Sequence, residues 1–88
     1  MDSLTGRKTP VLRNNLQIND NGFVFAFDLG TTFSVNRSGI EMLKMLQQGY
    51  TKEKIMVRIV ELFQITGPEF EIDFQDFIVQ LKNLRLIV

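Results

Sequence analysis

The sequence contains no cysteine, no histidine and no tryptophan among its 88 residues. Without cysteine there is no disulfide, thiolate metal ligand or thiol nucleophile, and a reducing compartment, the cytoplasm, is expected. Without histidine the chain lacks the side chain that most often transfers protons near neutral pH. We therefore expect a protein that is not an enzyme and that binds neither a cofactor nor a metal.

Neither sign of charge is in excess, because ten Lys and Arg are balanced by ten Asp and Glu. A chain of zero net charge does not concentrate phosphate backbones or anionic lipids at its surface. Its apolar runs are shorter than the roughly 18 residues that cross a bilayer. The polar start, MDSLTGRKTP, does not resemble a signal peptide. We expect neither nucleic acid nor membrane as a partner.

Some residue patterns suggest chemistry, but each has a simpler structural explanation. Asp73 with Asp76, or Glu69 with Asp73, would be helical neighbours, and exposed helix faces carry such carboxylate pairs routinely. Residues 19–21 offer oxygen ligands for Mg²⁺ or Ca²⁺ but lack the remaining ligands, so turn chemistry explains them better. Residues 28–32 begin like a phosphate loop, yet no second glycine, lysine or following helix supports one.

A DNA-binding winged helix is a further function class to consider. The basic residues available on the predicted second helix are Lys52, Lys54 and Arg58. Glu53 and Glu61 lie on the same helix, and this mixture of charges disfavours contact with phosphates. DNA binding is therefore the weakest of the alternatives.

The length and composition predict one small domain. With 88 residues and 44% hydrophobic content there is material for a single core. We expect a flexible N-terminal tail over residues 1–9 and a single domain over residues 10–88. A domain of this size without disulfides is modestly stable on its own, which leaves a homodimer open.

The first half of the domain has the pattern of a small antiparallel sheet. Residues 16–18 alternate apolar and polar, and residues 19–22 (NDNG) are a hairpin turn signal. The run 23–27 places three phenylalanines on one face and Val and Ala on the other, which predicts a central strand with both faces partly covered. Residues 31–35 predict a third strand with a free outer edge.

Three helices are predicted to follow the sheet. Residues 36–38 cap a first helix that ends at Gly49, and Thr51 caps a second. Gly67 and Pro68 begin a third. Its apolar stripe consists of Phe70, Phe74, Phe77, Ile78, Leu81 and Leu84, and residues 86–88 are expected to close the core. This order predicts an α+β, winged-helix-like fold, a three-stranded antiparallel sheet followed by three helices.

Such a fold offers one binding mode. An exposed strand edge beside an apolar helix margin can accept an extended peptide as an additional strand. Residues 31–35 and the helix over 74–84 would supply these two parts. The alternative is that the apolar residues in both segments are only core, and the pattern alone favours it for most of them.

At these same residues the chain resembles the PqqD-like family, small winged-helix domains linked to pyrroloquinoline quinone biosynthesis and to recognition of ribosomally made, modified peptides. The family's first pattern is matched by Val35, Asn36, Ser38, Gly39, Met42, Leu43, Met45, Leu46, Gly49 and Thr51. Its C-terminal pattern is matched by Asp73, Phe74, Phe77, Ile78, Leu81, Leu86 and Ile87. The chain departs from the family at Leu43, where an aromatic is common, at Gln48, where Asp is usual, and at Arg85, where glycine is expected.

The resemblance implies a non-enzymatic recognition module that binds the leader part of a precursor peptide by β-strand addition. It also implies a modifying enzyme, such as a radical S-adenosylmethionine protein, to which the peptide is presented. The implied peptide contacts are Thr32, Phe33, Ser34, Val35, Phe74, Ile78, Leu81, Lys82 and Arg85. Because the third strand is expected to have a free edge, Phe33→Pro is expected to remove one ladder amide and an aromatic contact. It should abolish peptide binding and leave the helices largely formed.

A second function is consistent with the same fold. The chain would then be a structural or regulatory interaction domain that has kept the fold without peptide modification. It would act as a homodimer or as the partner of a transport or sugar-modifying system.

Overall fold

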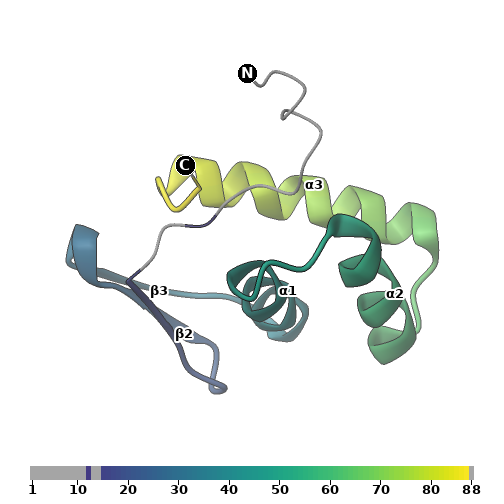
Figure 1. Cartoon of the computed structure of the whole chain (residues 1–88), viewed down its shortest axis with the longest axis horizontal. Coiled ribbons are helices and arrows are strands. Elements are labelled where there is room, and N and C mark those ends of the chain that lie inside the picture. Colours follow the sequence, from purple (N-terminus) through teal and green to yellow (C-terminus); the bar gives the residue numbers. More distant parts are fainter. Residues whose placement is uncertain (1–11, 13–14, 88) are drawn as a thin grey trace.

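The computed structural model describes residue 12 and residues 15–87 (Figure 1), so the predicted tail over residues 1–9 and the predicted core residue Val88 lie outside this part. The elements are β1 (Leu16–Ile18), β2 (Phe23–Ala26), the 3₁₀ helix η2 (Phe27–Leu29), β3 (Thr31–Ser34), α1 (Arg37–Gln47), α2 (Lys52–Phe63) and α3 (Gly67–Asn83). The predicted α+β fold, a three-stranded antiparallel sheet followed by three helices, is confirmed.

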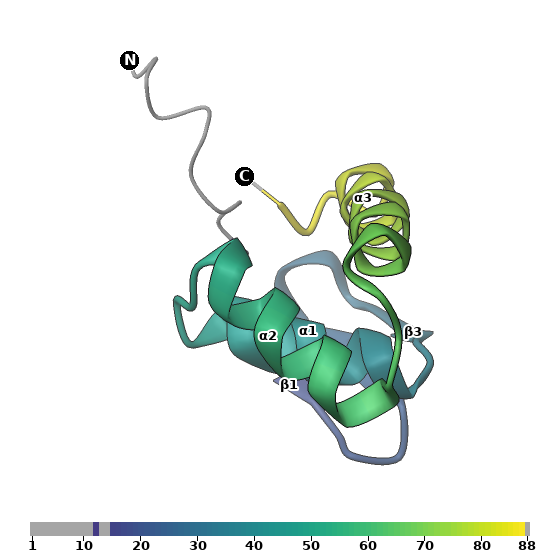
Figure 2. The ribbon, with the colours of Figure 1, turned by 90° about the vertical axis from the view of Figure 1, so that its right-hand side faces the viewer.

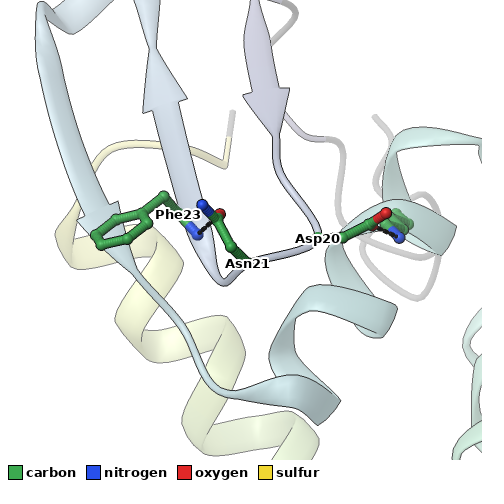
Figure 3. Close-up of polar contacts among 4 residues, drawn as sticks. Asp20, Asn21 and Phe23 are labelled. Carbon is green, nitrogen blue, oxygen red and sulfur yellow. Dashed lines mark hydrogen bonds and ion pairs between the residues drawn. The ribbon is translucent and has the colours of Figure 1, made fainter.

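The sheet is a meander with strand order β1-β2-β3, in which Val24 of β2 lies opposite Phe33 of β3. The hairpin turn lies where the sequence predicts it. Gly22 has a φ of 98°, which glycine adopts without steric cost. The Asn21 side chain accepts a hydrogen bond of 3.2 Å from the backbone N–H of Phe23 (Figure 3). The turn residues thus supply both the backbone angles and a local hydrogen bond.

The second strand ends one residue earlier than expected. Phe27 begins the short helix η2 instead of continuing β2, and Gly30 closes this helix with a φ of 61° and an N–H that donates to the Phe27 carbonyl. The alternating pattern of phenylalanines continues through Phe27 and gives no sign of this change. A tight 3₁₀ turn is short, and sequence periodicity does not mark its first residue.

The sheet is covered on one face only. Val24 and Ala26 are buried, whereas Phe23 is 49% and Phe27 is 54% exposed. The rings of Phe25 and Phe27 contact each other edge to face, with centroids 4.5 Å apart. The prediction that both faces of β2 are partly covered is therefore wrong. The prediction fails because all three helices lie on one side of the sheet (Figures 1 and 2), the side of Val24 and Ala26, and leave the phenylalanine face uncovered.

Side-chain caps fix the starts of the first two helices as predicted. The Asn36 side chain accepts a hydrogen bond of 2.8 Å from the Gly39 N–H at the start of α1. The Thr51 hydroxyl accepts one of 3.3 Å from the Lys54 N–H at the start of α2. Such caps satisfy amide groups that the helix itself leaves without partners.

The third helix begins with a capping box that was not predicted from the sequence. The Thr66 hydroxyl accepts from the Glu69 N–H at 3.2 Å, and the Glu69 carboxylate accepts from the Thr66 N–H at 2.8 Å. The backbone N–H of Thr66 first, and the nearby Thr66 side chain second, stabilise the Glu69 carboxylate and hold its pKa below its usual 4.5. The T-x-x-E spacing is the signal by which this cap is recognisable in the sequence.

The end of α3 explains one departure from the family pattern. Arg85 follows the helix with a φ of 63°, a left-handed conformation that glycine adopts most readily. Its N–H donates to the Lys82 carbonyl and the Leu86 N–H donates to the Leu81 carbonyl, each at 2.9 Å. This hydrogen-bond pattern turns the chain back so that Leu86 is buried. Arg85 thus adopts the left-handed conformation that ends the helix, at a position where the family has glycine.

The helices and the sheet enclose one cluster of buried hydrophobic residues. Figure 1 shows α3 running along one side of α1 and α2, and in Figure 2, where α3 is seen nearly end-on, β3 lies on the same side of the molecule as α3. Ile87 forms an isolated antiparallel bridge with Leu12. The cluster consists of Leu12, Leu16, Val24, Ala26, Ile40, Met42, Leu43, Met45, Leu46, Ile55, Ile59, Phe70, Phe74, Phe77, Leu81 and Leu86.

Candidate functional site

The outer edge of β3 presents backbone groups that bond to no other described strand. In an antiparallel sheet, successive residues direct their N–H and C=O groups alternately to the two neighbouring sides. Because the Val35 N–H donates to the Gly22 carbonyl at 2.9 Å, the odd-numbered residues of β3 face β2. Thr32 and Ser34 therefore direct their N–H and C=O groups outward. These two residues supply the donors and acceptors that an added strand would use.

The same alternation corrects the expectation for Phe33→Pro. The backbone of Phe33 faces Val24 within the sheet and is no part of the free edge. A proline at this position would break the pairing of β2 with β3 and would report on stability instead of peptide binding. The residues whose amides belong to the free edge are Thr32 and Ser34.

The opposite edge of the sheet is less accessible. The Gln47 side chain at the end of α1 donates a hydrogen bond of 3.0 Å to the Leu16 carbonyl of β1. This contact satisfies one of the outward-facing acceptors of β1 and places the end of α1 beside that edge. Among the described residues, β3 therefore carries the edge that is open to pairing.

A pocket lies between the end of β3 and α3. Its volume is about 310 Å³. It is lined by Ser34, Val35, Asn36, Ser38, Met42, Asp73, Asp76, Phe77 and Gln80. The strand, the start of α1 and one face of α3 thus meet beside the outward-facing backbone of Ser34. The arrangement has the two parts that strand addition requires, an open edge and an adjacent pocket for side chains.

Of the four strand residues predicted as peptide contacts, Thr32 and Ser34 direct their backbone groups outward at this edge. Thr32 and Ser34 are exposed, whereas Phe33 and Val35 are half-buried and pack against the core. Ser34 and Val35 also line the pocket.

The helix residues predicted as contacts do not line this pocket. Phe74 and Leu81 belong to the buried core, Ile78 is half-buried, and Lys82 and Arg85 are exposed. The pocket is lined instead by helix residues that were not predicted as contacts: Asp73, Asp76, Phe77 and Gln80. Their spacing of three, four and seven residues puts them on one face of α3.

The direction of this face is set by the packing of α3 on α2. Lys52 of α2 pairs with Glu71 at 2.7 Å and lies 5.7 Å from the centre of the Phe74 ring. Ile78 and Lys82 follow Glu71 at helical spacing, so they lie on the flank that faces α2. The sequence shows the apolar stripe, but it contains no signal for which flank of that stripe faces β3.

Gly39 permits the close approach of α1 to α3 at the pocket. A Cβ atom at this position would lie 3.0 Å from Asn36 Oδ1 and 3.2 Å from Phe77 Cε1. Both neighbours are constrained, since Asn36 caps α1 and Phe77 is buried. Glycine at this position is therefore required by space and not by backbone angle.

Gly39→Ala is expected to lower the free energy of unfolding by about 1 kcal/mol, because overpacking outweighs the higher helix propensity of alanine. Urea denaturation measures this change. Gly67→Ala is the matched control, since no atom lies within 4 Å of the Cβ it adds. The control is expected to be neutral or stabilising. A stabilised Gly39→Ala variant would contradict the proposed close approach.

A larger pocket lies on the other side of the Val35–Asn36 connection. Its volume is about 640 Å³, and it extends from the β1–β2 turn to the end of α2 at Leu62 and Phe63. At its wall Asp20 pairs with Lys44 of α1 (Figure 3), and this hydrogen bond raises the pKa of the Lys44 ammonium group. The pair joins the β1–β2 turn to α1.

Neither histidine nor cysteine occurs in the sequence. Within residue 12 and residues 15–87, no three or more acidic side chains are grouped so that they could hold a metal ion. The helices formed by these residues are too short or too polar to span a membrane. The geometry provides outward-facing main-chain groups on β3 and an adjacent side-chain pocket.

The model of one protein family, described as coenzyme PQQ synthesis protein D (PqqD), matches residues 21–87. The chain belongs to the PqqD family. The match covers β2, β3 and all three helices, and so includes the strand edge and the pocket. It confirms the family resemblance identified from the sequence.

A solved structure has the same fold as this PqqD family member. It is described as TbiB1 in complex with the TbiA(beta) leader peptide. The two chains are 22% identical with a TM-score of 0.76, over 88% of this chain and 93% of TbiB1. No curated protein matches the sequence significantly.

Proposed function

We propose that this protein is a non-enzymatic recognition module that binds the leader part of a precursor peptide by β-strand addition at β3. The observation that carries the proposal is the open edge at Thr32 and Ser34, beside a pocket formed with α3. Membership of the PqqD family and the fold shared with TbiB1, which was solved with a leader peptide, support it.

In this mechanism main-chain hydrogen bonds provide affinity and side-chain pockets provide specificity. The peptide would pair with Thr32 and Ser34, and every second side chain would point toward α3. The predicted contacts Phe33 and Val35 would support the peptide from the core side. Phe77 and Gln80 would join the contacts on the helix.

The protein itself would not modify the peptide, since its sequence lacks both histidine and cysteine. We propose that it presents the bound peptide to a separate modifying enzyme, such as a radical S-adenosylmethionine protein. The part of the peptide outside the added strand would remain available to that enzyme.

The test is an amide chemical-shift titration of isotope-labelled protein with leader segments of precursor peptides encoded beside its gene. Shifts should concentrate in residues 31–35 and in the pocket-lining part of α3, residues 73–80. Saturable shifts located elsewhere would contradict strand addition at β3. A spectrum that no candidate peptide changes would move the assignment to the second function.

That second function is an interaction domain that acts without peptide modification, as a homodimer. Phe23 and Phe25 on the exposed outer face of the sheet, with Phe27 of η2 against Phe25, favour it, because clustered exposed aromatic side chains are a feature of interaction surfaces. In the same spectra, this function predicts shifts at the three phenylalanines that depend on protein concentration when no peptide is present.

A further inference from the structure

Two acidic residues of α3 line the pocket beside β3, and among the described residues no basic one does. They are Asp73 and Asp76. Both are exposed, and neither side chain is paired with another described residue. Other acidic residues of the helix have partners, because Glu69 belongs to the capping box and Glu71 pairs with Lys52. The unpaired negative charge of α3 is thus concentrated where the peptide strand would lie.

The two carboxylates face the same space. Residues three apart on a helix are neighbours, and like charges at this spacing repel each other. A cation placed beside both carboxylates would relieve this repulsion and form charge-assisted hydrogen bonds. The remaining polar residues that line the pocket, Ser34, Asn36, Ser38 and Gln80, are neutral.

Three apolar side chains form part of the pocket wall. Met42 and Phe77 are buried residues of the core, and Val35 is half-buried beside them. A side chain with a long aliphatic stem and a cationic end matches this combination. Its stem would pack on the apolar surface while its charged end stays near the rim. Lysine and arginine have this structure.

We propose that this pocket selects a lysine or arginine of the bound peptide, at the end of the added strand that lies beside Ser34. The proposal rests on the proposed function, since it assigns a side-chain preference to the same peptide site. Asp73 and Asp76 would be the specificity-determining residues, and the outward backbone of Thr32 and Ser34 would provide affinity that does not depend on sequence.

A display selection tests the preference, and it can be carried out before the natural peptide is identified. A library of random 12-residue peptides is selected on the wild-type protein, on an Asp73→Asn/Asp76→Asn variant and on a Ser34→Pro variant. We expect Lys or Arg to be enriched at one position of the peptides selected by the wild type. The enrichment should disappear with the asparagine variant.

Binding of individual selected peptides then measures the size of the effect. Replacing the enriched arginine by citrulline, which has nearly the same shape without the charge, is expected to raise the Kd about 5- to 20-fold at low salt. Salt should weaken this difference. The Glu53→Gln/Glu61→Gln variant is the control, because it removes the same charge from exposed residues of α2 that do not line this pocket. This control variant should keep the wild-type ratio between the Kd values of the citrulline and arginine peptides.

The possible failures are distinguishable. In one outcome, the selected peptides bind the wild type and lose binding with Ser34→Pro, but show no preference for a basic residue. This outcome would overturn the present inference and leave strand addition intact. The inference would also be overturned if the Glu53→Gln/Glu61→Gln control reduced the difference in Kd between arginine and citrulline peptides as much as the asparagine variant does. Failure to select any peptide that depends on the β3 edge would overturn the proposed function, and this inference with it.

Discussion

Ser34→Pro is expected to weaken peptide binding at least about tenfold, the loss that corresponds to about 1.4 kcal/mol. Proline removes the outward N–H of Ser34, which an added strand would use, and its ring occupies the space beside the edge. Because that N–H faces away from β2, the sheet keeps its own hydrogen bonds. Proline is tolerated in edge strands for this reason.

The measurement is a fluorescence anisotropy titration with the leader segment that gives the largest amide shifts. Ser34→Ala is the matched control, since it removes the hydroxyl and keeps the amide, and its Kd should stay within about twofold of the wild type. Far-UV circular dichroism and urea denaturation report whether each variant is folded. A folded Ser34→Pro protein that binds with unchanged affinity would rule out strand addition at β3. Phe33→Pro should instead lower stability.

Phe70→Ala is expected to have the largest effect on stability, a loss of about 3–5 kcal/mol in the free energy of unfolding. Phe70 is fully buried, and its ring stacks on Phe74 with centroids 5.2 Å apart. A domain of this length has a total stability of about 4–13 kcal/mol. The substitution therefore removes a large fraction of it and can unfold the protein.

The matched control is Phe23→Ala, because the same side chain is 49% exposed there and should contribute less than about 1 kcal/mol. Urea denaturation of both variants gives the comparison. If Phe70→Ala does not fold, Phe70→Leu provides a smaller change with the same expected sign. Equal losses at positions 70 and 23 would mean that the core does not centre on α3.

The sequence predicts most of the fold because its signals are local. Asn36, Thr51 and Pro68 mark helix starts by their own hydrogen-bonding and steric properties, and each lies where it was expected. The order of strands and helices follows from these boundaries. The predictions that fail concern long-range packing: the sequence of β2 does not tell which of its two apolar faces the helices cover.

The site is less predictable for the same reason. Thr32 and Ser34 are recognisable as edge residues, but which backbone amides point outward depends on the pairing of all three strands. The pocket face of α3 depends on how Glu71 and Phe74 pack against α2. Asp73 and Asp76 appear in the sequence as an ordinary exposed pair. Their position beside β3 is what makes them candidates for peptide selection.

The hydrogen bond from Gln47 to the Leu16 carbonyl limits how this protein can assemble through its sheet. Growth of a sheet from chain to chain needs two open edges on every copy, as in a fibril. If this contact with α1 keeps β1 from pairing, assembly through β3 would end after one step, in a closed two-fold dimer or a complex with one peptide. The two products would use the same Thr32 and Ser34 groups, so dimer and peptide complex would exclude each other.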